Sequence, residues 1–188
     1  MSTAHNQPTA LRASVFWLCG LSGAGKSTLA DLLIGSLRER GIPVLALDGD
    51  ALRQGVNKGL GFSAEDRAEN LRRAASIARL ALDSGLCAVA SFITPLERHR
   101  RLAREIIGAE NFSLVFADAP FAVCQQRDVK GLYKRAASGN VPQFTGMTDP
   151  FERPAQADLV LHTEQEIPES SAAKLLAFTL ARLKAPGA

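Results

Sequence analysis

The sequence predicts an α/β protein, a three-layer sandwich with a five-stranded parallel β-sheet between two layers of helices. Two observations support this prediction. Short and almost wholly apolar segments alternate along the chain with longer segments that have the apolar spacing of amphipathic helices. Strands that are apolar throughout are typical of a parallel sheet that helices cover on both faces.

Local signals mark where each element begins or ends. Gly41 closes the first helix, Gly85 stops the second near Ser84, and Ser63-Ala-Glu-Asp66 resembles a capping box that opens that second helix. Pro95 is expected at the first position of the next helix. The expected strands are residues 15–19, 42–47, 86–93, 112–117 and 159–161. The expected helices are about 26–40, 64–84, 95 onward, 121–127 and 168–184.

The chain of 188 residues reads as one domain preceded by a tail. Residues 1–13 are polar and are expected to be a flexible tail, and residues 14–188 are expected to form the single domain. Residues 128–153 fit neither a strand nor a core helix, and they are rich in Gly, Lys, Arg, Asp and Pro. We expect this stretch to form a mobile lid over the carboxyl edge of the sheet, where ligands of such folds bind.

Composition excludes several classes of protein. Hydrophobic residues make up 46% and charged residues 22%, as in ordinary globular proteins, and the net charge of +3 gives no argument for nucleic acid. No apolar run approaches the ~18 residues that span a membrane, and the N-terminus lacks the pattern of a signal peptide. The three Cys are scattered in apolar surroundings, which predicts inert core thiols and a cytoplasmic location.

A Gly-rich run follows the first predicted strand and opens the first predicted helix. Gly20-Leu-Ser-Gly-Ala-Gly-Lys26-Ser27 matches G-x-x-x-x-G-K-[ST]. In this pattern glycines let backbone N–H groups surround phosphate oxygens, and the helix N-terminus adds its positive dipole end. Lys26 would neutralise the outer phosphates, and Ser27 would ligate Mg²⁺. The motif in this context predicts a nucleotide phosphate site, a P-loop.

Two carboxylates follow the second predicted strand, at the same edge of the sheet as the P-loop. One of Asp48 and Asp50 could hold Mg²⁺ through water, and the other could position an acceptor hydroxyl and take its proton. The alternative is an acidic turn that only caps the following segment.

Further basic residues suggest an anionic acceptor. Arg67, Asn70 and Arg73 share part of one helix face, and Arg53 and Phe62 precede them, so the group could bind an anionic aromatic ligand. A solvated helix face is the alternative. In the lid, basic residues could stabilise the transferring phosphoryl group, or they could simply make a basic surface loop. These residues are Arg127, Lys130, Lys134 and Arg135.

Six runs, taken together, resemble the adenylylsulfate kinase (APS kinase) family. The P-loop alone is shared by many nucleotide kinases, but the combination is specific, and it covers residues 15 to about 162. The runs are Gly20-LSGAGKS-Thr28, Asp48-GDAL-Arg53, Leu60-GFSAEDRAENLR-Arg73, Ser91-FIT-Pro95, Arg127-DVKGLYKR-Ala136 and Phe144-TGMTDPFER-Pro154.

The resemblance implies transfer of the ATP γ-phosphate to the 3′-hydroxyl of adenosine 5′-phosphosulfate (APS), which gives PAPS and ADP in sulfate activation. Asp50, Lys26 and Asp48 would be catalytic, with Mg²⁺ held by Ser27 and, through water, by Asp48. The ATP phosphates would contact Gly20, Ser22, Gly23, Ala24, Gly25, Lys26, Ser27, Thr28 and Arg127. The acceptor would contact Asp50, Arg53, Phe62, Arg67, Asn70, Ile93, Lys130 and Phe144. Phe62 and Phe144 would sandwich its adenine.

The chain departs from the family pattern at a few positions. Thr94 stands where the family commonly has a Ser that can be phosphorylated, and Leu96-Glu97 replaces a frequent Tyr-Arg. Two other readings therefore stay open: a related kinase for another nucleotide-linked acid, such as a cytidine diphosphoramidate, and a catalytically weak regulatory module. By the same resemblance, a homodimer and a sulfate adenylyltransferase partner are expected.

Overall fold

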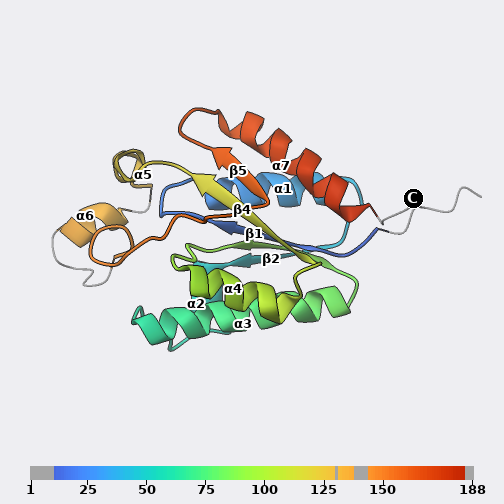
Figure 1. Ribbon diagram of the computed structural model, residues 1–188, viewed down its shortest axis with the longest axis horizontal. Coiled ribbons are helices and arrows are strands. Elements are labelled where there is room, and N and C mark those ends of the chain that lie inside the picture. Colours follow the sequence, from blue (N-terminus) through green and yellow to red (C-terminus); the bar gives the residue numbers. More distant parts are fainter. Residues whose placement is uncertain (1–10, 130, 138–143, 185–188) are drawn as a thin grey trace, which may run out of the picture.

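The computed structural model describes residues 11–129, 131–137 and 144–184. Its centre is a five-stranded sheet in the order β2-β3-β1-β4-β5, and every pair of neighbouring strands is parallel (Figure 1). The strands are β1 Val15–Cys19, β2 Val44–Asp48, β3 Cys87–Ser91, β4 Phe112–Asp118 and β5 Leu159–His162. The predicted α/β class with a parallel five-stranded sheet is confirmed.

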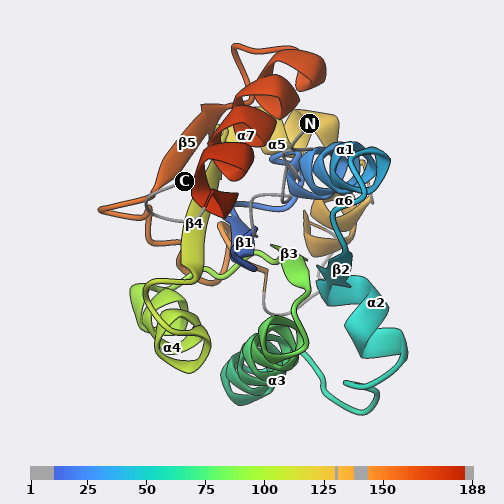
Figure 2. The ribbon, with the colours of Figure 1, turned by 90° about the vertical axis from the view of Figure 1, so that its right-hand side faces the viewer.

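Helices cover both faces of the sheet, so the molecule has three layers (Figures 1 and 2). Helices α1 and α7 pack together on one face, and α3 and α4 pack together on the other. In the described part of the chain, no helix is both long and apolar enough to cross a membrane. The helices are α1 Lys26–Glu39, α2 Gly49–Gln54, α3 Ala64–Asp83, α4 Glu97–Ile107, α5 Phe121–Arg127, α6 Leu132–Ala137 and α7 Pro168–Leu183.

The strand order places the P-loop at the point where the chain changes direction across the sheet. Strand β1 lies between β3 and β4, so the loop after it faces the crevice where ligands of open α/β sheets bind. The short helices α5 and α6 lie at this carboxyl end, and the two ends of the described chain meet at the opposite end (Figure 1). There, Leu11 bridges to Lys184, and Arg12 N donates to the Leu183 carbonyl.

The structure corrects some details of the predicted elements. Pro95 does not open a helix: α4 begins at Glu97 after the N-cap Leu96, so the prediction for Pro95 was wrong. Helices α2 and α6 lie in segments expected to be loop and lid, since six-residue helices leave too few positions for a periodic signal. The strands β2 and β5 lie at the sheet edges and are partly exposed, although their residues are as apolar as those of the buried inner strands.

The N-terminus of α3 uses half of the expected capping box. The Ser63 hydroxyl accepts from the Asp66 N–H at 3.1 Å. The Asp66 carboxylate, however, accepts from the Gly61 N–H at 2.9 Å rather than from Ser63. Asp66 therefore fixes the chain just before the helix, next to the exposed ring of Phe62.

The three cysteines are free and buried, as predicted. Burial raises the pKa of Cys19 to about 12 and also raises those of Cys87 and Cys124. At pH 8 only on the order of one Cys19 thiol in ten thousand would be the reactive thiolate. We expect a thiol-specific chromogenic reagent to label none of the three quickly in the native protein. All three should react at once in denaturant, and rapid labelling of native protein would contradict the buried positions.

Candidate active site

The glycines of the P-loop stand where no larger residue fits. Gly20 has a φ of +146°, and a Cβ there would lie 2.5 Å from the Ala117 carbonyl oxygen of β4. Gly23 has a φ of +78°, and a Cβ there would lie 2.8 Å from the Cys124 carbonyl oxygen of α5. The loop is therefore folded tightly between β4 and α5, with its backbone free to approach a ligand.

Helix α1 presents its N-terminus to this loop without a side-chain cap. Its N-cap is Gly25, in the left-handed conformation, which supplies no side-chain oxygen to the first N–H groups. The Lys26 side chain is only 8% exposed, and its Nζ donates to the Leu21 carbonyl at 2.7 Å. A lysine and helix N–H groups that lie together in this way favour the binding of a polyphosphate.

The carboxylate of Asp48 has two structural roles at the end of β2. Its Oδ1 caps α2 by accepting from the N–H groups of Asp50 (2.9 Å) and Ala51 (3.2 Å). Its Oδ2 accepts from the Ser27 hydroxyl at 3.4 Å, and Ser27 also lies 3.4 Å from the Ser91 hydroxyl. The capping alternative is thus correct for Asp48, but the same side chain also reaches the P-loop serine.

The donors around Ser27 suit Mg²⁺. Hydroxyl and carboxylate oxygens are hard ligands, and Mg²⁺ commonly uses one or two protein oxygens together with substrate phosphates and waters. Among the described residues no cluster of three or more His, Cys, Asp or Glu gathers as a metal site. The oxygens of Ser27 and Asp48 fit an ion that also contacts the phosphates of a nucleotide.

Arg53 and Phe62 form one wall of the site. The Arg53 guanidinium lies 4.6 Å from the centre of the Phe62 ring, and its Nη1 donates to the Gly61 carbonyl at 2.6 Å. Burial and the nearby Arg67 lower the pKa of Arg53. Phe62 is 61% exposed, so the ring has a large free surface for a planar ligand.

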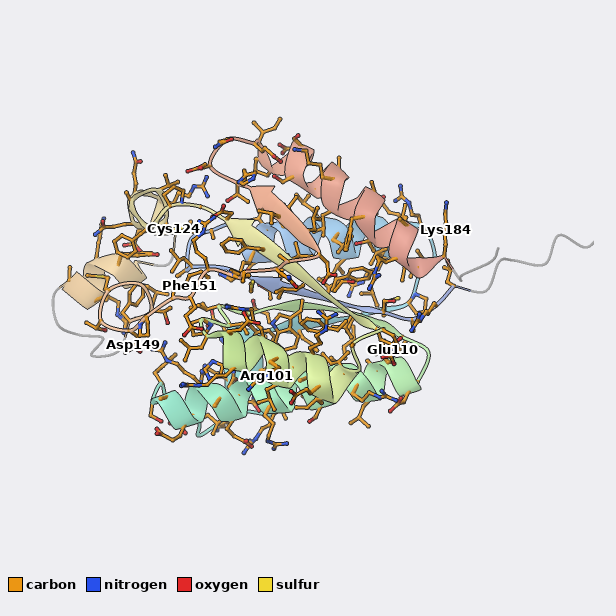
Figure 3. The ribbon with its side chains drawn as sticks, viewed as in Figure 1. Arg101, Glu110, Cys124, Asp149, Phe151 and Lys184 are labelled. Carbon is orange, nitrogen blue, oxygen red and sulfur yellow. The ribbon has the colours of Figure 1, made fainter. Side chains whose placement is uncertain are left out.

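Arg67 joins helix α3 to the last part of the lid segment, residues 144–153. Its Nη1 donates to the Thr145 hydroxyl at 2.5 Å, and its Nη2 lies 3.4 Å from Asp149 Oδ2. Asp149 lies toward the α6 end of the molecule (Figure 3). Asn70, one turn further along α3, is buried and accepts from the Asn57 side chain at 2.8 Å.

Phe144 is a core residue as well as a wall of the site. It is 6% exposed and meets the Tyr133 ring edge-on, with 4.8 Å between centroids. Its carbonyl accepts from the N–H groups of Met147, Thr148 and Asp149, so it anchors a compact turn. If the two rings enclose an acceptor, they differ in mobility: the Phe62 ring is exposed, whereas the Phe144 ring is packed in the core.

Thr94 lies in a buried, strained turn beside the acceptor region. It has a φ of +43°, is 1% exposed, and its hydroxyl accepts from the Trp17 indole at 2.8 Å. Arg100 donates to its carbonyl at 3.0 Å and pairs with Glu97 at 2.8 Å. Glu97 therefore neutralises a buried arginine of its own helix. Phosphorylation of Thr94 stays a prediction.

Most of the predicted residues line one cavity of about 570 Å³. Gly20 and Ala24 support the loop from outside the cavity wall, and Lys130 lies outside the described residues. Arg73 does not line the cavity and pairs with Glu69 at 2.7 Å, so for this residue the alternative of a solvated helix face is correct. From the predicted set, the cavity is lined by Ser22, Gly23, Gly25, Lys26, Ser27, Thr28, Asp48, Asp50, Arg53, Phe62, Arg67, Asn70, Ile93, Thr94, Arg127, Arg135 and Phe144, whereas Lys134 does not line it.

Some residues of the site, between β5 and the first turn of α7, were not predicted from the sequence. Thr163, Glu166 and Ser171 line the same cavity. The Thr163 hydroxyl donates to the Ala24 carbonyl at 2.9 Å, and its own carbonyl accepts from Arg127 at 2.6 Å. The only signal was their place after the last predicted strand, because the sheet brings every such loop to the same edge.

A P-loop at the end of the central parallel strand, with a carboxylate-bearing turn beside it and cations opposite, defines a P-loop kinase. Residues 12–162 match the family model described as adenylylsulphate kinase. An adenylyl-sulfate kinase of Paraburkholderia xenovorans is 52% identical over 90% of this chain and 94% of its own length. A Mycobacterium tuberculosis APS kinase, solved with AMPPNP and APS, superposes with a TM-score of 0.86 at 42% identity, over 90% of this chain and 98% of that one.

The chain belongs to the adenylyl-sulfate kinase family, and its enzyme class is the kinase that the sequence resemblance implied. One further relative shows how the domain is used elsewhere. A bifunctional enzyme CysN/CysC of Xylella fastidiosa is 46% identical over 87% of this chain, which spans only 26% of that longer protein.

Proposed function

We propose that the chain transfers the γ-phosphate of ATP to the 3′-hydroxyl of APS. The observation that carries this is the shared cavity, which joins a phosphate loop to an Arg-rich wall with an exposed aromatic ring. The donor residues come from the β1, β4 and β5 side, and most of the proposed acceptor residues come from α2, α3 and the loop between them, on the β2 and β3 side. The two substrates would therefore meet above the carboxyl end of β1.

On the donor side, the P-loop N–H groups and Lys26 would hold the ATP phosphates. Lys26 is already desolvated and fixed by the Leu21 carbonyl, so little reorganisation would be needed as charge moves to the leaving oxygen. Ser27 and Asp48 would hold Mg²⁺, which when bound neutralises phosphate charge. Arg127 is tied to Gly23 and Thr163, so it would support the loop from the α5 side.

On the acceptor side, Asp50 would accept the proton of the 3′-hydroxyl. The hydroxyl oxygen then bonds to the γ-phosphorus, the bond from that phosphorus to the bridging oxygen breaks, and ADP leaves. Asp50 lies in the first turn of α2, two residues beyond Asp48. Asp48 already caps α2 and accepts from Ser27, and the family resemblance assigns the acceptor hydroxyl to Asp50.

The phosphosulfate and ribose would be held by Arg53, Arg67 and Asn70, and the adenine by Phe62 and Phe144. Arginine forks suit the sulfate and phosphate oxygens. Ile93 and Lys130 complete the acceptor set as proposals from the resemblance. Residues 128–153 would act as a lid that excludes water.

Other properties are proposals of the same kind. The free thiols are typical of a reducing compartment and favour a cytoplasmic location. A homodimer is the proposed assembly, which light scattering would test.

A sulfate adenylyltransferase is the proposed partner because such an enzyme makes an adenylyl sulfate from ATP, and the Xylella relative places a matching domain in a longer bifunctional chain.

The test is ADP release by purified protein with ATP and Mg²⁺, using APS, AMP, CMP, a cytidine diphosphoramidate or no acceptor. We expect rapid release with APS alone, at the ~1–100 s⁻¹ typical of kinases. Comparable rates with the cytidine compound would favour the related-kinase reading. ATP binding without release under any condition would favour a regulatory module.

Replacing Phe62 with alanine should raise the KM for APS about 10-fold or more and leave the KM for ATP unchanged. Stacking of a base on an aromatic ring is worth roughly 1–3 kcal/mol, and the ring is too exposed to support the core. Initial rates with each substrate varied in turn would measure this. The control is Leu80→Ala on α3, a similarly exposed apolar residue away from the cavity. An effect on ATP alone would contradict the placement of Phe62.

A further inference from the structure

One lid residue that the proposed chemistry does not use touches both halves of the site. Tyr133, on α6, is 2% exposed although its helix lies at the outer end of the molecule (Figure 1). Its hydroxyl donates to the Ser22 carbonyl at 2.9 Å, within the P-loop. A lid side chain is thus bonded directly to the loop proposed to hold the ATP phosphates.

The ring of Tyr133 contacts the acceptor side. It meets Phe144 edge-on at 4.8 Å between centroids and an interplanar angle of 73°. On another side it meets Phe121 of α5 at 5.5 Å and 72°. Edge-on contacts of this kind favour one orientation of each ring, so the plane of Phe144 depends on Tyr133.

The backbone around Tyr133 is also fixed. The carboxylate of Asp128 accepts from the Tyr133 N–H at 3.0 Å and from the Lys134 N–H at 3.1 Å, which holds the start of α6 against the end of α5. Burial raises the pKa of Tyr133 above its usual range, so the hydroxyl remains a proton donor to Ser22 at any working pH. The backbone of Tyr133 is therefore held in place, so its side chain can in turn hold Ser22 and Phe144 in place.

We propose that Tyr133 is a positioning residue that sets the P-loop and the acceptor aromatic relative to each other. The hydroxyl holds the Ser22 backbone, and the ring edge holds Phe144. The two contacts come from one side chain, so a shift of the lid would move both substrate sites together. The proposal rests on the proposed function for its acceptor half, whereas its donor half requires only that the P-loop binds ATP.

Two substitutions separate the two contacts. Tyr133→Phe removes the hydroxyl and keeps the ring, so the KM for ATP should rise about 3- to 10-fold, the factor expected for one lost hydrogen bond. The KM for APS should stay within about twofold. Tyr133→Leu removes both contacts and should raise both KM values. The control, Phe121→Leu, removes a different ring contact of Tyr133 and leaves the contacts with Ser22 and Phe144 in place, so both KM values should stay within about twofold.

A second readout does not depend on turnover. Calorimetric binding of a non-hydrolysable ATP analogue should weaken about 3- to 10-fold in Tyr133→Phe, even if the wild-type protein fails to phosphorylate APS. Tyr133 is the single tyrosine of the chain, so the tyrosinate absorbance of the native protein reports on it alone and should not develop below the unfolding pH. Unchanged ATP-analogue binding in Tyr133→Phe would overturn the proposal, as would equal losses in Tyr133→Leu and Phe121→Leu.

Discussion

Replacing Lys26 with alanine is expected to lower kcat by on the order of 10²–10³-fold or more. The ammonium group is nearly buried and is held 2.7 Å from the Leu21 carbonyl, which aims it at the phosphate loop. Charge that develops on the phosphates in the transition state would lose a cation that is held in the phosphate loop. Single-turnover rates with saturating ATP and APS would measure the loss of chemistry separately from binding.

The matched control is Lys184→Ala. Lys184 is an exposed lysine just after α7, at the end of the molecule opposite the lid (Figure 3). This variant should keep the wild-type rate. A kcat near normal for Lys26→Ala, in a protein with an unchanged circular dichroism spectrum, would discredit the phosphate site.

Replacing Asp50 with asparagine is expected to lower kcat about 10²–10⁴-fold while the KM for ATP changes little. A positioned general base contributes a factor of this size, and the amide keeps the shape but cannot take the proton. Asp50 is a cleaner test than Asp48, because Asp48 caps α2 and its loss would disturb the local backbone.

The control for Asp50 is Asp83→Asn at the end of α3. Asp83 is exposed and pairs only with Arg79 among the contacts described for it, at 3.0 Å. It should leave all kinetic constants unchanged. If the rate depends on pH in the same way in the wild-type protein and in Asp50→Asn, another group takes the proton.

The sheet and the main helices could be predicted because their signals are local. The apolar strands, the Ser63 cap and the glycines at 41 and 85 act within a few residues of where they stand. Pro95 shows the limit of this reasoning. A proline is compatible with a helix start, but the Pro95 carbonyl accepts from the Glu152 N–H at 2.8 Å, a contact with a distant segment. The strained Thr94 turn and this contact delay the helix to Glu97.

The site could be predicted where a motif marks it and not where only packing forms it. The P-loop and the Asp48–Asp50 turn lie at the carboxyl edge of the sheet because parallel strands must end there. Thr163 carries no such motif, and it becomes part of the site only because β5 pairs with β4. The contacts of Phe62 with Arg53 and of Phe144 with Tyr133 likewise join residues that are about ten positions apart in the chain, so no local pattern predicts them.

The most direct test of the kinase assignment follows the transferred group itself. Purified protein would be incubated with Mg²⁺, APS and ATP that carries a label in its γ-phosphate, and the products would be separated and identified by mass and by nuclear magnetic resonance of phosphorus. The label should appear on the 3′-oxygen of APS, in one equivalent per ADP formed, and Asp50→Asn should slow its appearance. Label recovered only as inorganic phosphate, or on another position of the acceptor, would contradict it.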